Sequence, residues 1–82
     1  MSDLIERARS ARRLPAPSAA RAIRVAAGAT QQEVAGKLGV HRVTVARWEY
    51  GARRPRGELL VAYVMLLDQL GGVAPPAESG AA

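Results

Sequence analysis

The sequence predicts an all-α protein, folded as a compact bundle of about five helices. Its 82 residues leave room for one domain, and a chain of this length buries only ~60% of the surface that it exposes when unfolded. Phe is absent and Trp occurs once, so Leu, Val, Ile and Ala must fill the interior. Apolar residues recur at helical spacing in Ala-rich and Leu-rich segments, which favour helix over sheet.

The first predicted helix covers residues 3–13. Its apolar side is formed by Leu4, Ile5, Ala8 and Ala11. Pro15 and Pro17 follow and are expected to end it, because proline disrupts a helix interior. We therefore expect residues 1–17 to form an N-terminal helix followed by a proline linker.

The second predicted helix covers residues 19–27, with Ser18 as its N-cap. Its apolar residues are expected to face inward, and Arg21 and Arg24 to face outward. Gly28 stands where a left-handed residue would end the helix.

Two short helices with a glycine between them are predicted next. Thr30-Gln31-Gln32-Glu33 has the spacing of a capping box, in which the hydroxyl and the carboxylate each accept a hydrogen bond from a backbone amide. The helix that it opens ends at Gly39, and another covers residues 41–49 with Val45 and Trp48 facing inward. This arrangement is typical of a helix-turn-helix, whose second helix enters the major groove of DNA.

The last predicted elements are a basic loop over residues 52–56 and a helix over residues 57–70. We expect the helix-turn-helix domain to span residues 18–71. Residues 72–82 combine Pro-Pro with Ser, Gly and Ala, a composition that predicts a disordered tail.

Composition narrows the function. The net charge is +5 and all but one of the 12 cations are Arg, the residue suited to forked contacts with phosphate and guanine. Cys is absent and His occurs once, so we expect no cofactor, no metal site and no enzymatic activity. Because we recognise no secretory signal and no apolar run long enough to span a bilayer, we expect a cytoplasmic protein.

Several motifs occur together between Thr30 and Arg56. They are Thr-Gln-x-Glu-x-Ala from Thr30, Leu-Gly-Val from Leu38, and Arg-Trp-Glu-x-Gly from Arg47 followed by Arg54-Pro55. With them, residues 19–70 resemble the Cro/phage-repressor-type helix-turn-helix, also called the XRE family. The resemblance implies a lambda-repressor-like DNA-binding domain, to which the helix over residues 3–13 is an addition. His41 departs from the Ser or Thr usual in the family, which is expected to weaken the cap of the recognition helix.

The resemblance also implies roles for individual residues. The positions that read bases are Arg42, Val43 and Arg47, where an Arg would fork onto guanine and Val43 would suit a thymine methyl. The positions that hold phosphates are Gln31, His41, Thr44, Tyr50, Arg53 and Arg56. Two alternatives stay open: Arg47 could pair with a neighbouring turn, and Glu33 could orient Arg42 or Arg47 besides capping its helix.

The final helix carries apolar residues on two sides, and each side needs a cover. Opposite its main stripe stand Val61, Val64 and Met65. Since the family usually dimerises through its C-terminal region, we expect this second side to form a homodimer interface. The competing cover is the N-terminal helix, through Leu4, Ile5 and Ala8.

These observations predict a protein that binds double-stranded DNA. We expect it to bind a palindromic operator as a homodimer. The favoured function is transcriptional repression by promoter occlusion. The alternative is the antitoxin of a toxin–antitoxin pair, which would bind its protein partner through residues 1–14 or the tail. An adaptor that uses the fold only for protein contacts is a further alternative, which predicts that Arg42→Ala and Arg47→Ala leave function intact.

Overall fold

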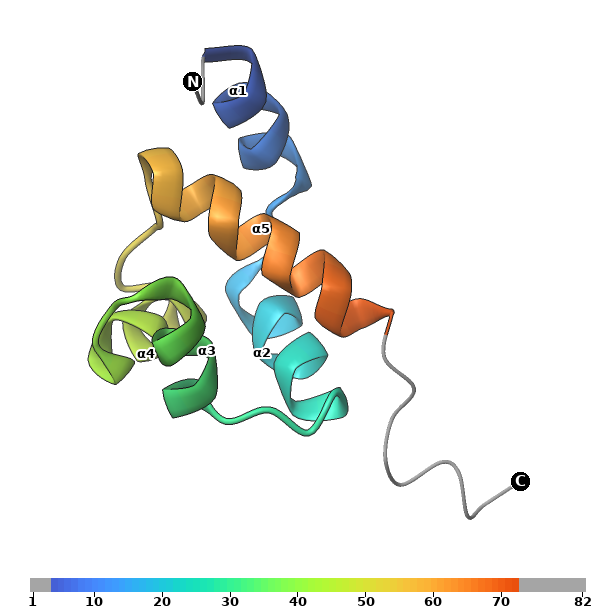
Figure 1. Cartoon of the computed structure of the whole chain (residues 1–82), viewed down its shortest axis with the longest axis vertical. Helices are drawn as coiled ribbons and strands as arrows, with labels where there is room; N and C mark the ends of the chain where they lie inside the picture. The colour runs from blue at the N-terminus through green and yellow to red at the C-terminus, as the bar shows by residue number, and fades with distance from the viewer. Residues whose placement is uncertain (1–3, 73–82) are drawn as a thin grey trace.

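The computed structural model describes residues 4–72, which form five helices and no strand (Figure 1). In chain order they are α1 (Leu4–Arg13), α2 (Pro17–Ala26), α3 (Gln31–Leu38), α4 (Arg42–Tyr50) and α5 (Gly57–Gly71). The predicted all-α bundle of about five helices is confirmed. The tail predicted over residues 72–82 lies, apart from Gly72, outside the described residues.

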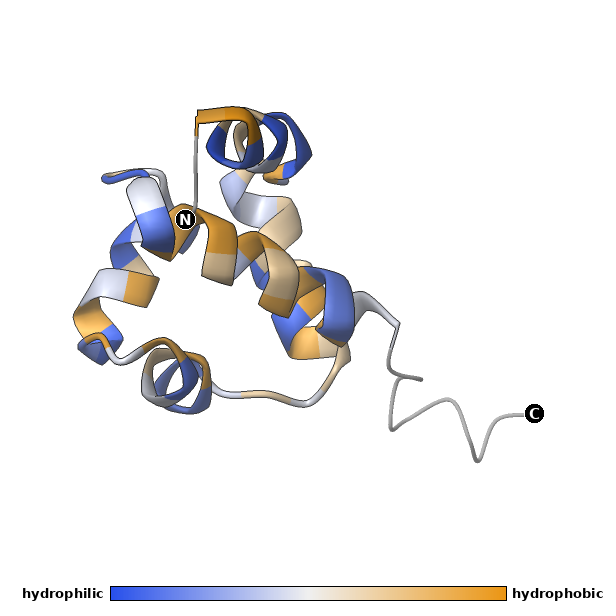
Figure 2. Cartoon of the chain, turned by 45° about the horizontal axis from the view of Figure 1, so that its top comes forward, coloured by the Kyte–Doolittle hydropathy of each residue, from blue (hydrophilic) through white to orange (hydrophobic). Residues whose placement is uncertain are grey.

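The core forms where α2, α3 and α4 meet α5. Figure 2 shows α5 as a strongly hydrophobic helix that lies among the others. The rings of Trp48 and Tyr63 lie 4.7 Å apart between centroids, in a tilted arrangement that is favourable for aromatic pairs. The buried residues that surround them are Ala20, Val34, Ala35, Val45 and Leu67. The predicted inward positions of Val45 and Trp48 are therefore confirmed.

The start of α2 differs from the prediction. Ala16 precedes the helix, no side chain caps it, and Pro17 occupies its first turn. Proline suits this position because its fixed φ is already helical and its missing N–H would have no partner within the helix. Ser18 therefore lies inside the helix, and its predicted role as the N-cap is wrong. Gly28, with φ +78°, does adopt the left-handed conformation predicted at the end of this helix.

Helix α1 packs against α5, but not through the side that the sequence predicts. Ser10 is buried, whereas Leu4 and Ile5 are 76% and 63% exposed. Ser10 follows Leu4 by six residues and Ile5 by five, so it lies about 120° and about 140° away from them around the helix. Helix α1 therefore turns the side that bears Ser10 towards α5 and leaves Leu4 and Ile5 exposed.

The second side of α5 is already covered within the chain. Val61 and Val64 are only 8% and 3% exposed, whereas Met65 is 53% exposed. Helix α1 lies on α5, and the Arg13 guanidinium pairs with the Asp68 carboxylate. The prediction that Val61 and Val64 stand open to a second copy of the chain is therefore wrong. Of the three residues assigned to a dimer interface, Met65 remains accessible.

Candidate nucleic-acid interface

The N-terminus of α3 is fixed by the capping box that the sequence predicts. The Thr30 hydroxyl accepts a hydrogen bond from the Glu33 backbone N–H at 3.0 Å. The Thr30 backbone N–H donates to Glu33 Oε1 at 2.8 Å. Glu33 therefore acts as a capping partner, and Arg42 finds a different acceptor, described below.

The turn between α3 and α4 depends on Gly39. Its φ of +70° lies in the left-handed region, which residues with a Cβ rarely adopt. The next residue, Val40, donates its backbone N–H to the Ala35 carbonyl at 3.0 Å. Ala35 is fully buried, so its small side chain lets α3 and α4 pack closely. Together these contacts set the angle at which α4 leaves the turn.

His41 caps α4, although it stands where the family usually has Ser or Thr. Its Nδ1 accepts a hydrogen bond from the Val43 backbone N–H at 3.2 Å. An imidazole nitrogen thus replaces the hydroxyl oxygen that Ser or Thr would supply. The first turn of α4, which presents Arg42 and Val43, is therefore anchored by a side chain.

A buried ion pair joins α2 to α4, and the sequence analysis missed it. Arg24 was expected to face outward, but its Nε donates to Glu49 Oε2 at 2.6 Å and its Nη2 donates to Glu49 Oε1 at 2.9 Å. Its Nη1 donates to the Ala29 carbonyl at 2.8 Å. The outward prediction for Arg24 is wrong because Glu49, 25 positions along the chain, draws the guanidinium into the interior.

The pair holds both groups in their charged forms. Burial acts to raise the pKa of the Glu49 carboxyl, but hydrogen bonds from Arg24 and Gln31 outweigh it and leave that pKa lowered. The hydrogen bond to Glu49 raises the pKa of Arg24 against the opposing effect of burial. Nearby, burial raises the pKa of Tyr63 to about 12.

Hydrogen bonds extend from the buried pair to the start of α4. Gln31 Nε2 donates to Glu49 Oε1 at 3.1 Å. Arg42 Nη1 in turn donates to Gln31 Oε1 at 3.0 Å. A continuous path of side chains thus connects Arg24 in the interior with Arg42 on the surface.

The other residues predicted to contact DNA gather on both sides of α4. A hollow of about 400 Å³ on one side is lined by Thr44, Arg47, Arg53 and Arg56, among others. A hollow of about 340 Å³ on the other side is lined by Gln31, Val43, Arg47 and Tyr50, among others. Arg47 borders both hollows, so the outward side of α4 is continuous with the 52–56 loop and with the start of α3.

A comparison with known protein families identifies the family to which this arrangement of helices belongs. Residues 21–69, more than half of the chain, match the profile of the helix-turn-helix family. The chain belongs to the Cro/C1-type helix-turn-helix (XRE) family. This is a family of DNA-binding regulators, as the resemblance in the sequence implied. No curated protein and no solved structure matched the chain.

The match separates two parts of this helix-turn-helix protein. It begins within α2 and ends near the end of α5, so α1 lies outside it. The capping box, Gly39, the buried ion pair and both hollows beside α4 involve residues within the match or next to it. The part of the chain that matches the family therefore contains all of these features, and α1 contributes to none of them.

Two arginines near α4 were missed as candidate DNA contacts. Arg54 lines the same hollow as Arg53 and Arg56, and Arg21 lines the hollow that contains Gln31 and Val43. The sequence could have indicated Arg54 as a DNA contact, because it lies in the basic loop over residues 52–56. Nothing in the sequence near Arg21 indicates its neighbours, because α2 approaches α4 only in the folded chain.

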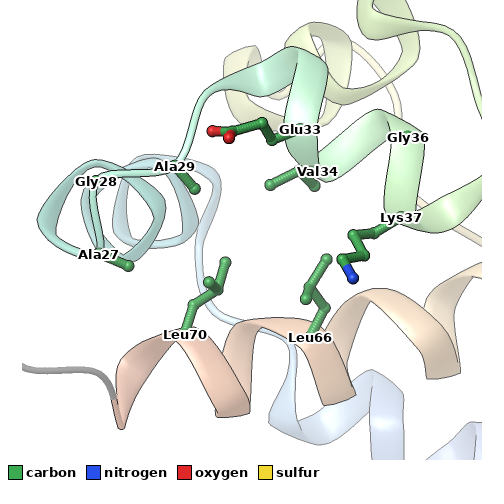
Figure 3. Close-up of a pocket in the computed structure, with 9 residues that line it drawn as sticks. All are labelled: Ala27, Gly28, Ala29, Glu33, Val34, Gly36, Lys37, Leu66 and Leu70. Carbon is green, nitrogen blue, oxygen red and sulfur yellow. The ribbon is translucent and has the colours of Figure 1, made fainter.

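A larger hollow of about 570 Å³ lies away from these residues, between α2, α3 and α5. Figure 3 shows Leu66 and Leu70 pointing from α5 towards Ala29 and Val34, with Lys37 reaching over from α3. Its lining is mainly aliphatic. It extends the core to the surface and has no arginine in its wall.

Residues 4–72 contain neither a cluster of metal-ligating side chains nor a membrane-spanning helix. No cluster of three or more His, Cys, Asp or Glu side chains in this range could hold a metal ion. None of its helices has the length and apolar character needed to cross a membrane.

Proposed function

We propose that this helix-turn-helix protein is a transcriptional repressor that occupies promoter DNA with α4 in the major groove. The observation that carries the proposal is the charge around α4. Of the two acids in residues 19–56, Glu49 is neutralised by Arg24 in the buried ion pair, and Glu33 lines the hollow between α2, α3 and α5, away from the outward side of α4. The exposed arginines nearby are left to set the surface potential, and they are Arg21, Arg42, Arg47, Arg53, Arg54 and Arg56. Such a basic surface attracts the phosphate backbone.

Within this proposal, base reading belongs to the exposed face of α4. Arg42, Val43 and Arg47 would meet base edges, because the N-terminal part of a recognition helix lies deepest in the groove. The residues that would hold phosphates and fix the register are Gln31, His41, Thr44, Tyr50, Arg53 and Arg56. We include Arg54 in this group, because it lines the same hollow as Arg53 and Arg56.

The proposal is tested by comparing arginines at different places on the surface. Fluorescence anisotropy with a preferred duplex and with its single-base variants should show that Arg47→Ala removes discrimination at one base position. Arg53→Ala should weaken binding to all duplexes alike and lower the slope of log affinity against log salt by about 1. The matched control is Lys37→Ala, which removes a cation beside the hollow of Figure 3 and should change neither quantity. Equal loss on every duplex for Arg47→Ala would refute its base-reading role.

We further propose that the repressor acts as a homodimer on a palindromic operator, since two recognition helices must fit two half-sites. Large apolar side chains remain exposed in the single chain at Met65 on α5 and at Leu4 and Ile5 on α1. Light scattering should give twice the 8.7 kDa mass of one chain. Leu4→Glu combined with Ile5→Glu should return it to the mass of one chain without unfolding α2 to α5. A wild-type mass of one chain at micromolar concentration would contradict the dimer.

One observation favours a second function, the antitoxin of a toxin–antitoxin pair that regulates its own operon. Helix α1 lies outside the residues that match the family, and its side bearing Leu4 and Ile5 faces solvent. That side could hold a protein partner instead of a second copy. Coexpression with the product of a neighbouring gene distinguishes the two functions. An antitoxin relieves growth arrest caused by that product, and the Leu4→Glu, Ile5→Glu variant loses this effect while it still binds DNA.

A further inference from the structure

We propose that Arg7 on α1 extends the DNA-binding surface beyond the residues that match the family, by holding a phosphate of the DNA backbone next to those bound by the 52–56 loop. This inference rests on the proposed function, because it names a further contact with the same duplex. Helix α1 lies outside the family match, so the family assigns no role to its arginines.

The linker that follows α1 fixes the position of this helix. Its first residue, Leu14, packs against the main core. The linker, residues 14–17, and the basic loop together line one hollow of about 190 Å³. A Cβ placed on Gly51 would lie 3.6 Å from Pro17 Cγ, so the linker also lies against the end of α4. Helix α1 is therefore attached directly beside the loop that follows the recognition helix.

Arg7 stands on the side of α1 that borders this loop. A second hollow, of about 420 Å³, is lined by Ala11 and Leu14 from one direction and by three arginines of the loop from the other. Arg7 precedes Ala11 by four residues and Leu14 by seven, so it lies only about 40° and about 20° from them around the helix. Its side chain is half-buried, in keeping with a place along this hollow.

The arginines around this hollow repel one another in the free protein. The described residues that line it include Arg53, Arg54 and Arg56 and no acid. Glu58, at the start of α5, is exposed, and within the described part of the chain neither it nor Arg7 takes part in an ion pair. Like charges that stay unpaired destabilise the compact state. An anion placed between them would relieve this repulsion, so the cluster is suited to bind one.

The DNA backbone supplies such an anion at this place. In the proposed complex Arg53 and Arg56 hold phosphates, and each strand carries one phosphate charge for about every 3.4 Å of helix axis. A phosphate bound by the loop therefore has further phosphates close by. Arginine suits a contact with one of them, because its planar guanidinium forms forked hydrogen bonds with phosphate.

The test measures how strongly binding depends on salt. Each phosphate contact releases counter-ions and adds about 0.9 to the slope of log affinity against log salt. For each chain bound to a preferred duplex, Arg7→Ala should lower this slope by about 1 in fluorescence anisotropy. The wild type should then lose about three- to fourfold more affinity than the variant between about 50 and 200 mM salt. Because phosphates carry no sequence information, the variant should weaken binding to all duplexes alike.

The matched controls are Arg9→Ala and Arg12→Ala. They remove the same charge from the same helix, and both side chains are exposed. Around the helix they lie about 160° and about 140° from Arg7, so they face away from the hollow. Each control should leave the slope nearly unchanged. Arg7→Lys keeps the charge and should keep most of the slope, and circular dichroism checks that every variant is folded.

Three results would overturn the inference. One is an unchanged slope in a folded Arg7→Ala. The second is an equal change of slope in Arg7→Ala and both controls, because α1 would then act only through its total charge. The third is a loss of the dimer in Arg7→Ala, measured by light scattering, which would assign this side of α1 to a second copy of the chain. If the wild type itself binds no duplex, the proposed function fails and the inference falls with it.

Discussion

Arg24–Glu49 and Arg13–Asp68 are both ion pairs between helices, but they differ in burial. The first joins α2 to α4, and its side chains are 10% and 3% exposed. The second joins α1 to α5, and its side chains are 55% and 63% exposed. The first lies within the residues that match the family, whereas Arg13 lies outside them.

The difference shows which helices form the rigid part of the molecule. A buried charge has lost its hydration, so it depends on its partner and on further hydrogen bonds. An exposed charge regains water when its partner is removed, and its pairing contributes little. Helices α2 and α4 are thus held in one relative position, and the exposed pair adds little to the packing of α1 on α5.

The largest loss of stability is expected when the buried Arg24–Glu49 pair is broken. Glu49→Ala leaves the Arg24 guanidinium buried without its counter-ion and should lower the free energy of unfolding by about 3–5 kcal/mol. Urea denaturation followed by circular dichroism measures this change. The combined replacement Arg24→Met, Glu49→Leu should recover most of the loss, because no buried charge remains. A loss below about 1 kcal/mol in Glu49→Ala would contradict the assignment.

Acid should weaken the same pair. The pKa of Glu49 in the folded chain lies below its ordinary value of 4.5, so the unfolded chain takes up a proton first as the pH falls. The stability that this carboxylate contributes is present in full above its ordinary pKa and is lost as the pH falls towards the folded-state value. Urea denaturation at several pH values should show this loss in the wild type and a smaller one in Glu49→Gln. Equal acid sensitivity of both proteins would contradict it.

An intermediate loss of stability is expected at Thr30, whose exposed side chain caps the backbone of α3. Thr30→Ala removes the acceptor for the Glu33 N–H and should lower the free energy of unfolding by about 1 kcal/mol. Thr30→Ser keeps the hydroxyl and is the matched control in thermal melts. If both variants lose the same stability, the capping hydrogen bond is not responsible.

The smallest loss of stability is expected when the exposed Arg13–Asp68 pair is broken. Arg13→Ala and Asp68→Ala should each lower the free energy of unfolding by less than about 1 kcal/mol, and added salt should reduce this difference. Urea denaturation at low and high salt measures both. A loss as large as that of Glu49→Ala would remove the distinction between the two pairs.

The sequence predicted the local features of the site well. The Thr30 capping box, the left-handed Gly39 and the inward Val45 and Trp48 are each encoded within a few residues. Helical spacing and glycine positions are local signals, so one segment suffices to interpret them. The family resemblance rested on the same segment, and the family match confirms it.

Features that depend on distant contacts could not be predicted. Arg24 was placed on the surface because its helix alone does not show that Glu49 will meet it. The side of α1 that is buried was predicted wrongly because α5, the helix on which α1 packs, lies far along the chain. In both cases a side chain was assigned from its own helix, whereas its partner comes from another part of the chain.

The most direct test of the central claim, that α4 reads base sequence, is selection from a library of random duplexes. The wild-type chain should enrich a defined sequence, and Arg47→Ala should enrich one that has lost a single base position per half-site while its other positions persist. Arg53→Ala should enrich the wild-type sequence with lower yield. No enriched sequence for the wild type, or the same sequence for wild type and Arg47→Ala, would contradict the claim.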